Sequence, residues 1–95
     1  MIEEQRAVLE QALRIYEERN RKYNDNWRRF GWRGCVFRVR ERAERAWDAL
    51  FWAEDGAEAV DDLLDLINFA AFTVRAIREG NRDGTWFESQ VQADE

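Results

Sequence analysis

The sequence predicts an all-α fold, a small MazG-like helical bundle of about three main helices in one domain, residues 1–95, and three observations support this. The chain contains no proline and only five glycines, so few residues interrupt a helix. Apolar residues recur at steps of three and four, as on one face of a helix, and do not alternate as in a strand. The length lies near the lower limit for a domain that folds alone. We therefore expect oligomerisation to complete the bundle.

The first helix is predicted from about Ile2 to Tyr23, with residues 1–19 as an N-terminal helical unit. Glu3 and Glu4 suit the positive end of its dipole. The apolar residues expected to face the core are Val8, Leu9, Ala12, Leu13, Ile15 and Tyr16.

The segment from Lys22 to Gly34 is rich in asparagine, aspartate, glycine and aromatic residues, which is typical of an ordered loop. Two interpretations of its aromatic residues stay open. Trp27, Phe30 and Trp32 either fill the end of the bundle or form a surface that stacks bases and binds phosphate. The first is favoured, because aromatic side chains bury large areas wherever they occur.

The second helix is predicted from about Val36 to Trp52, and its charged face carries Glu41 and Glu44, one turn apart. The apolar stripe expected to be buried is Val36, Val39, Ala43, Ala46, Trp47 and Leu50. Ordinary surface ion pairs would explain the charged face, with Arg38 and Arg45 beside Glu41, and Arg40 beside Glu44.

The third helix is predicted from an N-cap at Asp55 to about Glu79, with Gly80 and Asn81 ending it. Its apolar stripe is expected to comprise Val60, Leu63, Leu64, Ile67, Ala70, Ala71 and Val74. Asp65 and Asn68 interrupt this apolar sequence beside Phe72. A carboxylate there needs an arginine, a metal ion or open solvent. In the tail, residues 85–95, we expect Trp86 and Phe87 to dock and the end to be loose.

Composition excludes several classes of site. The chain has no histidine and one cysteine, so a Cys/His zinc site and a histidine-based triad are ruled out. No apolar segment is long enough to span a bilayer, and the N-terminus does not resemble a signal peptide, so we expect a cytoplasmic protein.

The charge is unevenly distributed along the chain. The net charge is −5, yet the segment from Arg19 to Arg45 has ten basic and three acidic residues. Nucleic acid is an improbable partner, since the acidic remainder would repel it.

Helices joined by a short turn pack antiparallel, which would bring the second helix's Glu41 and Glu44 toward acids of the third helix. Those acids are Glu58, Asp61, Asp62 and Asp65. Carboxylates on facing helices are typical ligands of Mg²⁺, which also binds phosphates. Spacing therefore indicates a magnesium–phosphate site that supports attack of an activated water on a phosphoanhydride.

A series of short motifs is more specific. It consists of Lys22-Tyr23-x-Asp25-x-Trp27, Gly31-x-x-Gly34, Arg38-x-x-Glu41-Arg42-x-x-Arg45 and Asp62-x-x-Asp65-Leu-x-Asn68-Phe-Ala. Over about residues 20–84 this series resembles the nucleotide modification associated domain 1 family of small phage and bacterial proteins. That family looks related to the MazG-like all-α nucleoside triphosphate pyrophosphohydrolases.

The resemblance implies that Mg²⁺ is bound by Glu41, Glu44, Asp62 and Asp65, and that a nucleotide is cut to monophosphate and pyrophosphate. Two features depart from the family pattern. Arg40 stands where the superfamily often has a second acid, and Glu41 lies opposite the apolar stripe. Since superfamily members commonly form dimers or tetramers, we expect a second subunit to cover the Glu41 face, with Phe37 and Trp52 at its rim.

Two functions follow as expectations. The first is a Mg²⁺-dependent pyrophosphohydrolase acting on a (d)NTP or modified nucleotide, in the host cytoplasm if the protein is phage-encoded. The second is a protein that binds and sequesters or senses a nucleotide without cutting it, in which carboxylates orient arginines instead of metal. The residues expected to contact the nucleotide are Lys22, Asp25, Trp27, Trp32, Arg38, Arg42, Arg45 and Asn68.

Overall fold

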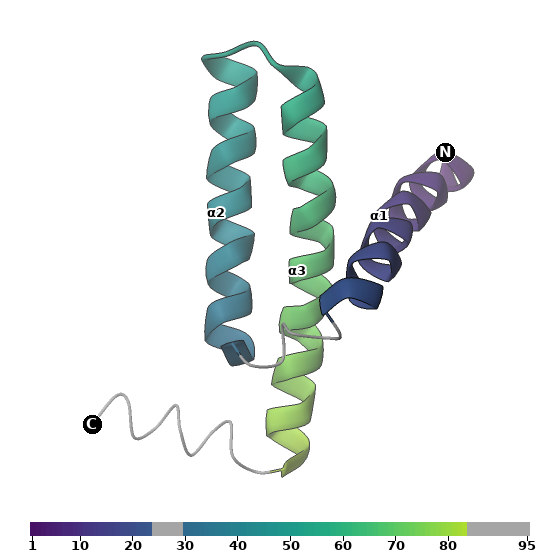
Figure 1. The fold of residues 1–95 in the computed structure, drawn as a ribbon, viewed down its shortest axis with the longest axis vertical. Coiled ribbons are helices and arrows are strands. Elements are labelled where there is room, and N and C mark those ends of the chain that lie inside the picture. Colours follow the sequence, from purple (N-terminus) through teal and green to yellow (C-terminus); the bar gives the residue numbers. More distant parts are fainter. Residues whose placement is uncertain (24–29, 84–95) are drawn as a thin grey trace.

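The computed structural model describes residues 1–23 and 30–83, which form three helices (Figure 1). They are α1 (Ile2–Tyr23), α2 (Gly31–Phe51) and α3 (Gly56–Asp83). The described part of the chain contains no strand, so the all-α prediction is confirmed. None of its helices is both long and apolar enough to cross a membrane.

Helices α2 and α3 form an antiparallel hairpin (Figure 1), as their short connection predicts. The turn places Glu54 in a left-handed conformation, with φ of 51°. Asp55 then caps α3, because its Oδ1 accepts a hydrogen bond from the Glu58 backbone N–H at 3.0 Å. The predicted N-cap is confirmed.

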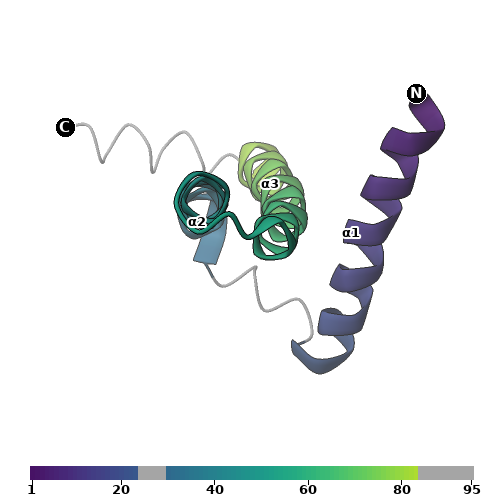
Figure 2. The same cartoon turned by 90° about the horizontal axis from the view of Figure 1, so that it is seen from above.

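Helix α1 lies beside α3 and diverges from the hairpin toward its N-terminus (Figure 2). The interactions with α3 come from its second half. Asn68 donates a hydrogen bond to the Ala12 carbonyl at 2.8 Å, and Tyr16 meets Phe72 edge to face with ring centroids 5.1 Å apart. Residues 1–11 are all exposed. The apolar residues Val8, Leu9 and Leu13, predicted to be buried, are instead about half exposed.

The core is small and has two parts. Ala46 and Ala49 of α2 pack with Ala59 of α3 near the turn, and these small side chains let the helices approach closely. Toward the other end, Cys35 and Phe72 are buried, with Phe69 and Tyr16 packed against them. The two parts hold α2 against α3, and Tyr16 ties α1 to them.

Two predicted helix boundaries were wrong. Helix α2 begins at Gly31, five residues before the expected Val36, so the end of the expected loop is helical. A Cβ at Gly34 would lie 2.4 Å from the Phe30 Cβ, so this glycine provides room for Phe30 inside a helix and does not mark a turn. Helix α3 continues through Gly80 to Asp83. A glycine inside a helix costs only about 1 kcal/mol relative to alanine. A helix can therefore end at a glycine, but it can also continue through one, as α3 does at Gly80.

The expected buried stripes of α2 and α3 were wrong in part. Ala46 and Leu64 are buried as predicted. However, many of the large apolar residues of both stripes are exposed, namely Val36, Trp47, Leu50, Val60, Leu63 and Val74. The two helices meet mainly through small residues, such as Ala46, Ala49 and Ala59, instead.

The predictions for the loop and the tail are tested only in part. Phe30 is exposed, so it does not fill the end of the bundle. Trp27 and the tail from Gly84 to Glu95 lie outside the described residues.

Candidate functional site

Eight charged side chains from all three helices form two neighbouring sets of ion pairs, which we together term the arginine–carboxylate cluster: one set is built around Arg42 and Asp65 and the other around Arg45. Helix α1 contributes one residue, α2 four and α3 three. The members are Arg19, Arg38, Glu41, Arg42, Arg45, Glu58, Asp62 and Asp65.

Asp65 is the point at which the three helices meet. Its Oδ1 accepts a hydrogen bond from Arg19 Nη1 at 2.6 Å, and its Oδ2 lies 3.3 Å from Arg42 Nε. The side chain of Asp65 is only 13% exposed. Of the three explanations that the sequence leaves open for this carboxylate, the structure shows arginine partners.

Arg42 joins the carboxylates of the two hairpin helices. Its Nη1 donates to Glu41 Oε1 at 2.9 Å, while its Nε faces Asp65. The guanidinium carbon lies 5.8 Å from the centroid of the Phe69 ring, within range of a cation–π interaction. The side chain is 17% exposed, so water screens these contacts less than it would at the surface.

Glu41 accepts hydrogen bonds from two arginines at the same oxygen, since Arg38 Nη1 also lies 2.9 Å from its Oε1. The hydrogen bond from Arg38 is the main reason that the pKa of Glu41 is lowered, and the positive charges of Arg38, Arg42 and Arg45 add to it. Glu41 is therefore ionised at neutral pH and fixes the orientation of two guanidinium groups.

Arg45 connects α2 to the beginning of α3. Its Nη2 donates to Glu58 Oε1 at 3.1 Å, and its Nε lies 3.4 Å from Asp62 Oδ1. Asp62 is only 3% exposed. Burial raises the pKa of Asp62, and the charge of Arg45 opposes this only in part.

Two polar atoms of the cluster are buried without a hydrogen-bond partner among the described residues. They are Asp62 Oδ2 and Arg42 Nε, and the latter is close to Asp65 but poorly aligned for a hydrogen bond. Buried polar groups are almost always satisfied in folded proteins. Arg42 Nε is ion-paired with Asp65, so, of these two atoms, Asp62 Oδ2 is the one that a water molecule or a ligand would most readily satisfy.

The structure brings together six of the residues that the sequence singled out for a site. These are Arg38, Glu41, Arg42, Arg45, Asp62 and Asp65. Asn68 lies one turn beyond Asp65, but its amide holds the Ala12 carbonyl and so joins α3 to α1.

Other predicted residues lie elsewhere. Glu44 is exposed and pairs with Arg40 at 3.2 Å, as surface pairing predicts. Trp32 lies in the first turn of α2, ten residues before Arg42 and about 15 Å from it along the helix axis, and Arg33 lies over its ring. The Lys22 side chain, Asp25 and Trp27 fall outside the described residues.

The four carboxylates expected to share Mg²⁺ do not converge. Glu44 is on the exposed side of α2, and Glu41 and Asp65 are each held by two arginines. Among residues 1–23 and 30–83, no group of three or more His, Cys, Asp or Glu side chains is arranged to hold a metal ion. As arranged, these four side chains do not fit a common Mg²⁺ site, although Asp62 Oδ2 has a free lone pair.

Two members of the cluster, Arg19 and Glu58, were not among the predicted site residues. Glu58 gives a sequence signal, because it lies one turn before Asp62 on the acidic face of the third helix. Arg19 gives none, since it is 46 residues from Asp65 and only the packing of α1 brings it there.

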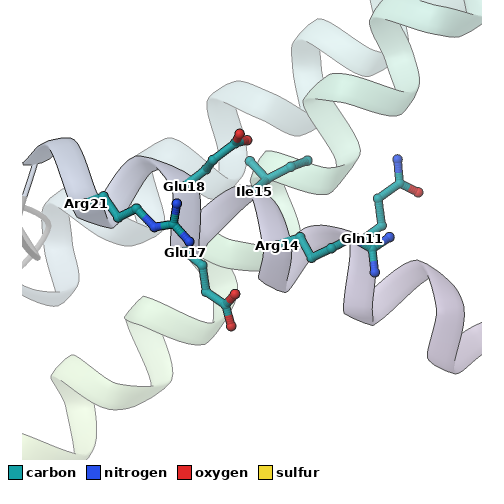
Figure 3. A pocket seen from close by; sticks show the side chains of 6 residues that line it. All are labelled: Gln11, Arg14, Ile15, Glu17, Glu18 and Arg21. Atoms are coloured by element: carbon teal, nitrogen blue, oxygen red, sulfur yellow. The ribbon is translucent and has the colours of Figure 1, made fainter.

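A separate hollow lies on the surface of α1 (Figure 3). Its lining residues all come from that one helix: Gln11, Arg14, Ile15, Glu17, Glu18 and Arg21. It shares no residue with the arginine–carboxylate cluster. A hollow lined by a single helix, with both signs of charge, does not enclose a ligand.

Comparison with protein-family models, curated proteins and solved structures finds no match to this chain. The resemblance to the nucleotide modification associated domain 1 family therefore stays a prediction from its motifs.

The opposite pKa shifts of Asp62 and Glu41 give a testable prediction. The pKa of Asp62 is higher in the folded than in the unfolded protein, so its ionisation destabilises the fold at pH values above the unfolded pKa. The variant Asp62→Asn replaces this carboxyl group by a neutral amide of the same shape. It should therefore raise the melting temperature at pH 7. The gain should shrink as pH falls toward the ordinary aspartate value of 3.8. The matched change Glu41→Gln should lower the melting temperature at pH 7, because the lowered pKa of Glu41 contributes stability that is lost on acidification.

Melting curves followed by circular dichroism from pH 3 to pH 7 would measure both effects. A decrease in melting temperature for Asp62→Asn at pH 7 would show that the Arg45 contact outweighs the cost of burial.

Proposed function

We propose that the arginine–carboxylate cluster binds the phosphate of a nucleotide, and that the protein sequesters or senses this nucleotide without hydrolysing it. The observation that carries the proposal is the contact set of Arg42 and Arg45, each held by two carboxylates, of which at least one belongs to α3. A guanidinium group fixed in this way loses little conformational entropy when an anion binds. Fixed arginines are suited to forked hydrogen bonds with phosphate.

The arginines keep donors for such a ligand. A guanidinium group has five N–H donors, and the contacts described above involve two nitrogens of Arg45 and one of Arg38. About half of the Arg38, Arg45 and Arg19 side chains is exposed, so a ligand can reach these three arginines.

The balance of charge restricts the ligand. The cluster has four arginines and four carboxylates, so its formal charge is zero when all are ionised. A ligand with three or four negative charges would meet repulsion from the carboxylates, which a singly charged phosphodiester or a monophosphate largely avoids. Nucleotides that carry a single phosphodiester or monophosphate group, including signalling nucleotides of that kind, are therefore the preferred class.

A second candidate is the Mg²⁺-dependent pyrophosphohydrolase predicted from the motifs. The observation that favours it is the unused Asp62 Oδ2, one turn from Asp65, because a cation is one partner that such an oxygen can take. This function requires Glu41 and Asp65 to exchange arginine for metal. Asp65→Asn should then abolish release of pyrophosphate from (d)NTPs, and release that persists in this variant would rule out the metal role.

A thermal-shift screen separates the two candidates. Mono-, di-, tri- and signalling nucleotides are each tested with Mg²⁺ and with a chelator, alongside an assay for pyrophosphate. At a hundred times its Kd a ligand stabilises the folded state by about 2.7 kcal/mol, which corresponds to roughly 10 °C or more for a domain of this size.

A shift that persists in chelator, without pyrophosphate release, is the expected result. Mg²⁺-dependent release of pyrophosphate would establish the enzyme instead. The absence of any shift across the panel would refute nucleotide binding. The proposal includes a cytoplasmic location and a homo-oligomer, without assigning the oligomer interface to the Glu41 face.

A further inference from the structure

Many of the large apolar residues of the α2–α3 hairpin lie outside its core, although Leu64 and Phe72 are buried. Six of those outside the core are 42–59% exposed and define what we term the apolar face: Val36, Trp47 and Leu50 of α2 with Val60, Leu63 and Val74 of α3. The residues between the two helices are mainly small, such as Ala46, Ala49 and Ala59. A soluble single-chain domain normally has the reverse distribution.

The six residues lie on one side of the hairpin. Successive residues of a helix turn by about 100°, so on α2 the apolar face lies roughly a quarter turn from Ala46, which faces α3. On α3 it lies about a quarter turn from Ala59, which faces α2. Because the helices are antiparallel (Figure 1), these rotations point to the same side.

The arginine–carboxylate cluster lies on the opposite side. Arg42 and Arg45 are displaced from Ala46 in the other rotational direction, and Arg19 brings α1 to that side through Asp65. The hairpin therefore has a charged side that contacts α1 and an apolar side that none of the contacts described above covers.

We infer that the apolar face binds a second copy of this chain, so that two hairpins form a four-helix bundle across a two-fold axis. The spans Val36–Leu50 and Val60–Val74 are each about 21 Å long, so the face is a two-helix surface of matched length. A second copy supplies an equal surface, since a two-fold interface uses the same patch twice. The face has no charged member, so two copies do not repel each other there.

The area also suits a dimer. Half-exposed side chains of these types together present roughly 230–420 Å² of apolar surface, taking about 60–120 Å² for a whole Val or Leu and about 150–250 Å² for Trp. Apolar atoms make up about 60% of a typical interface, so this core with its polar rim corresponds to roughly 400–700 Å² per partner, the range of a weak and reversible dimer, below the roughly 800 Å² per partner of a stable complex. The interface differs from the one expected at the Glu41 face and leaves the cluster accessible.

Sedimentation velocity of the full chain tests this inference. Wild type should show a concentration-dependent shift from 11.4 kDa toward twice that mass. Ala43 is exposed and lies between Val36 and Trp47 on the apolar face, so Ala43→Arg should weaken the dimer by about a hundredfold without removing any monomer contact. Leu63→Asn, on the other helix, should act in the same direction.

Phe37→Arg is the matched control, because Phe37 is on the same helix and 61% exposed but lies away from the apolar face. It should dimerise like wild type, and circular dichroism verifies that each variant is helical. Wild type that is monomeric at every concentration overturns the inference. So does a dimer that Ala43→Arg leaves unchanged, or one that Phe37→Arg disrupts equally.

Discussion

Replacing Arg42 by methionine is expected to weaken nucleotide binding by about 10- to 100-fold. Arg42 is the most enclosed arginine of the cluster by exposed fraction, and Glu41 and Asp65 hold its guanidinium group in place. A hydrogen bond from a charged group to a ligand contributes about 1.5–3 kcal/mol, which corresponds to this loss of affinity. Methionine keeps an unbranched side chain of similar length but removes the guanidinium group, including its contact with the Phe69 ring. Isothermal titration calorimetry with a nucleotide that shifts the melting temperature would measure the change.

Arg40→Met is the control for this prediction. Arg40 lies on the same helix two residues earlier, but it is exposed and pairs with Glu44 on the far side. It should bind nucleotide with the wild-type Kd. Equal losses in the two variants would mean that the net positive charge of α2, and not the cluster, determines affinity.

Replacing Phe72 by alanine is expected to lower the free energy of unfolding by about 3–5 kcal/mol, the cost of removing a buried aromatic ring. Phe72 lies beside Cys35 of α2 and meets Tyr16 of α1 and Phe69 of α3, so it contributes to holding all three helices. Domains have a total stability of only about 5–15 kcal/mol, and this core is small. The variant should therefore be partly unfolded at room temperature, which urea titration followed by circular dichroism would show.

Phe37→Ala should change the same free energy by less than about 0.5 kcal/mol, because Phe37 is exposed on the outer side of α2. A small effect of Phe72→Ala would mean that the Cys35 and Phe72 cluster does not support the fold. A large effect of Phe37→Ala would mean that this side of α2 is covered in solution.

Local sequence signals predicted the helices well where they act through neighbouring residues. The bounds of α1 and the Asp55 cap agree with the structure, since dipole and capping interactions involve residues within one turn. The start of α2 and the end of α3 were missed, because Gly34 and Gly80 are compatible with a helix as well as with a turn. Whether a glycine ends a helix depends on what packs beside it, as Phe30 does at Gly34.

The candidate site was predictable in part for the same reason. Arg38 and Glu41 are three residues apart on one helix, so their hydrogen bond follows from helical geometry. The partners of Asp65 were left open, because Arg19 and Arg42 come from other helices. The burial of Asp62 likewise depends on the packing of α2 against α3.

The sequence by itself determined the helical class, the number of helices, the antiparallel hairpin and the set of charged residues on α2 and α3, because these depend on periodicity and short connections. The tertiary structure alone decided which face of each helix is buried. Both Ala46 and Trp47 are apolar at plausible core positions, and only the close approach of α2 and α3 selects the smaller one. This packing leaves large apolar residues such as Trp47 exposed, and it brings Arg19 to Asp65. The hydrophobic effect is not directional, so the sequence pattern predicts that an apolar helix face is covered but does not predict which element covers it.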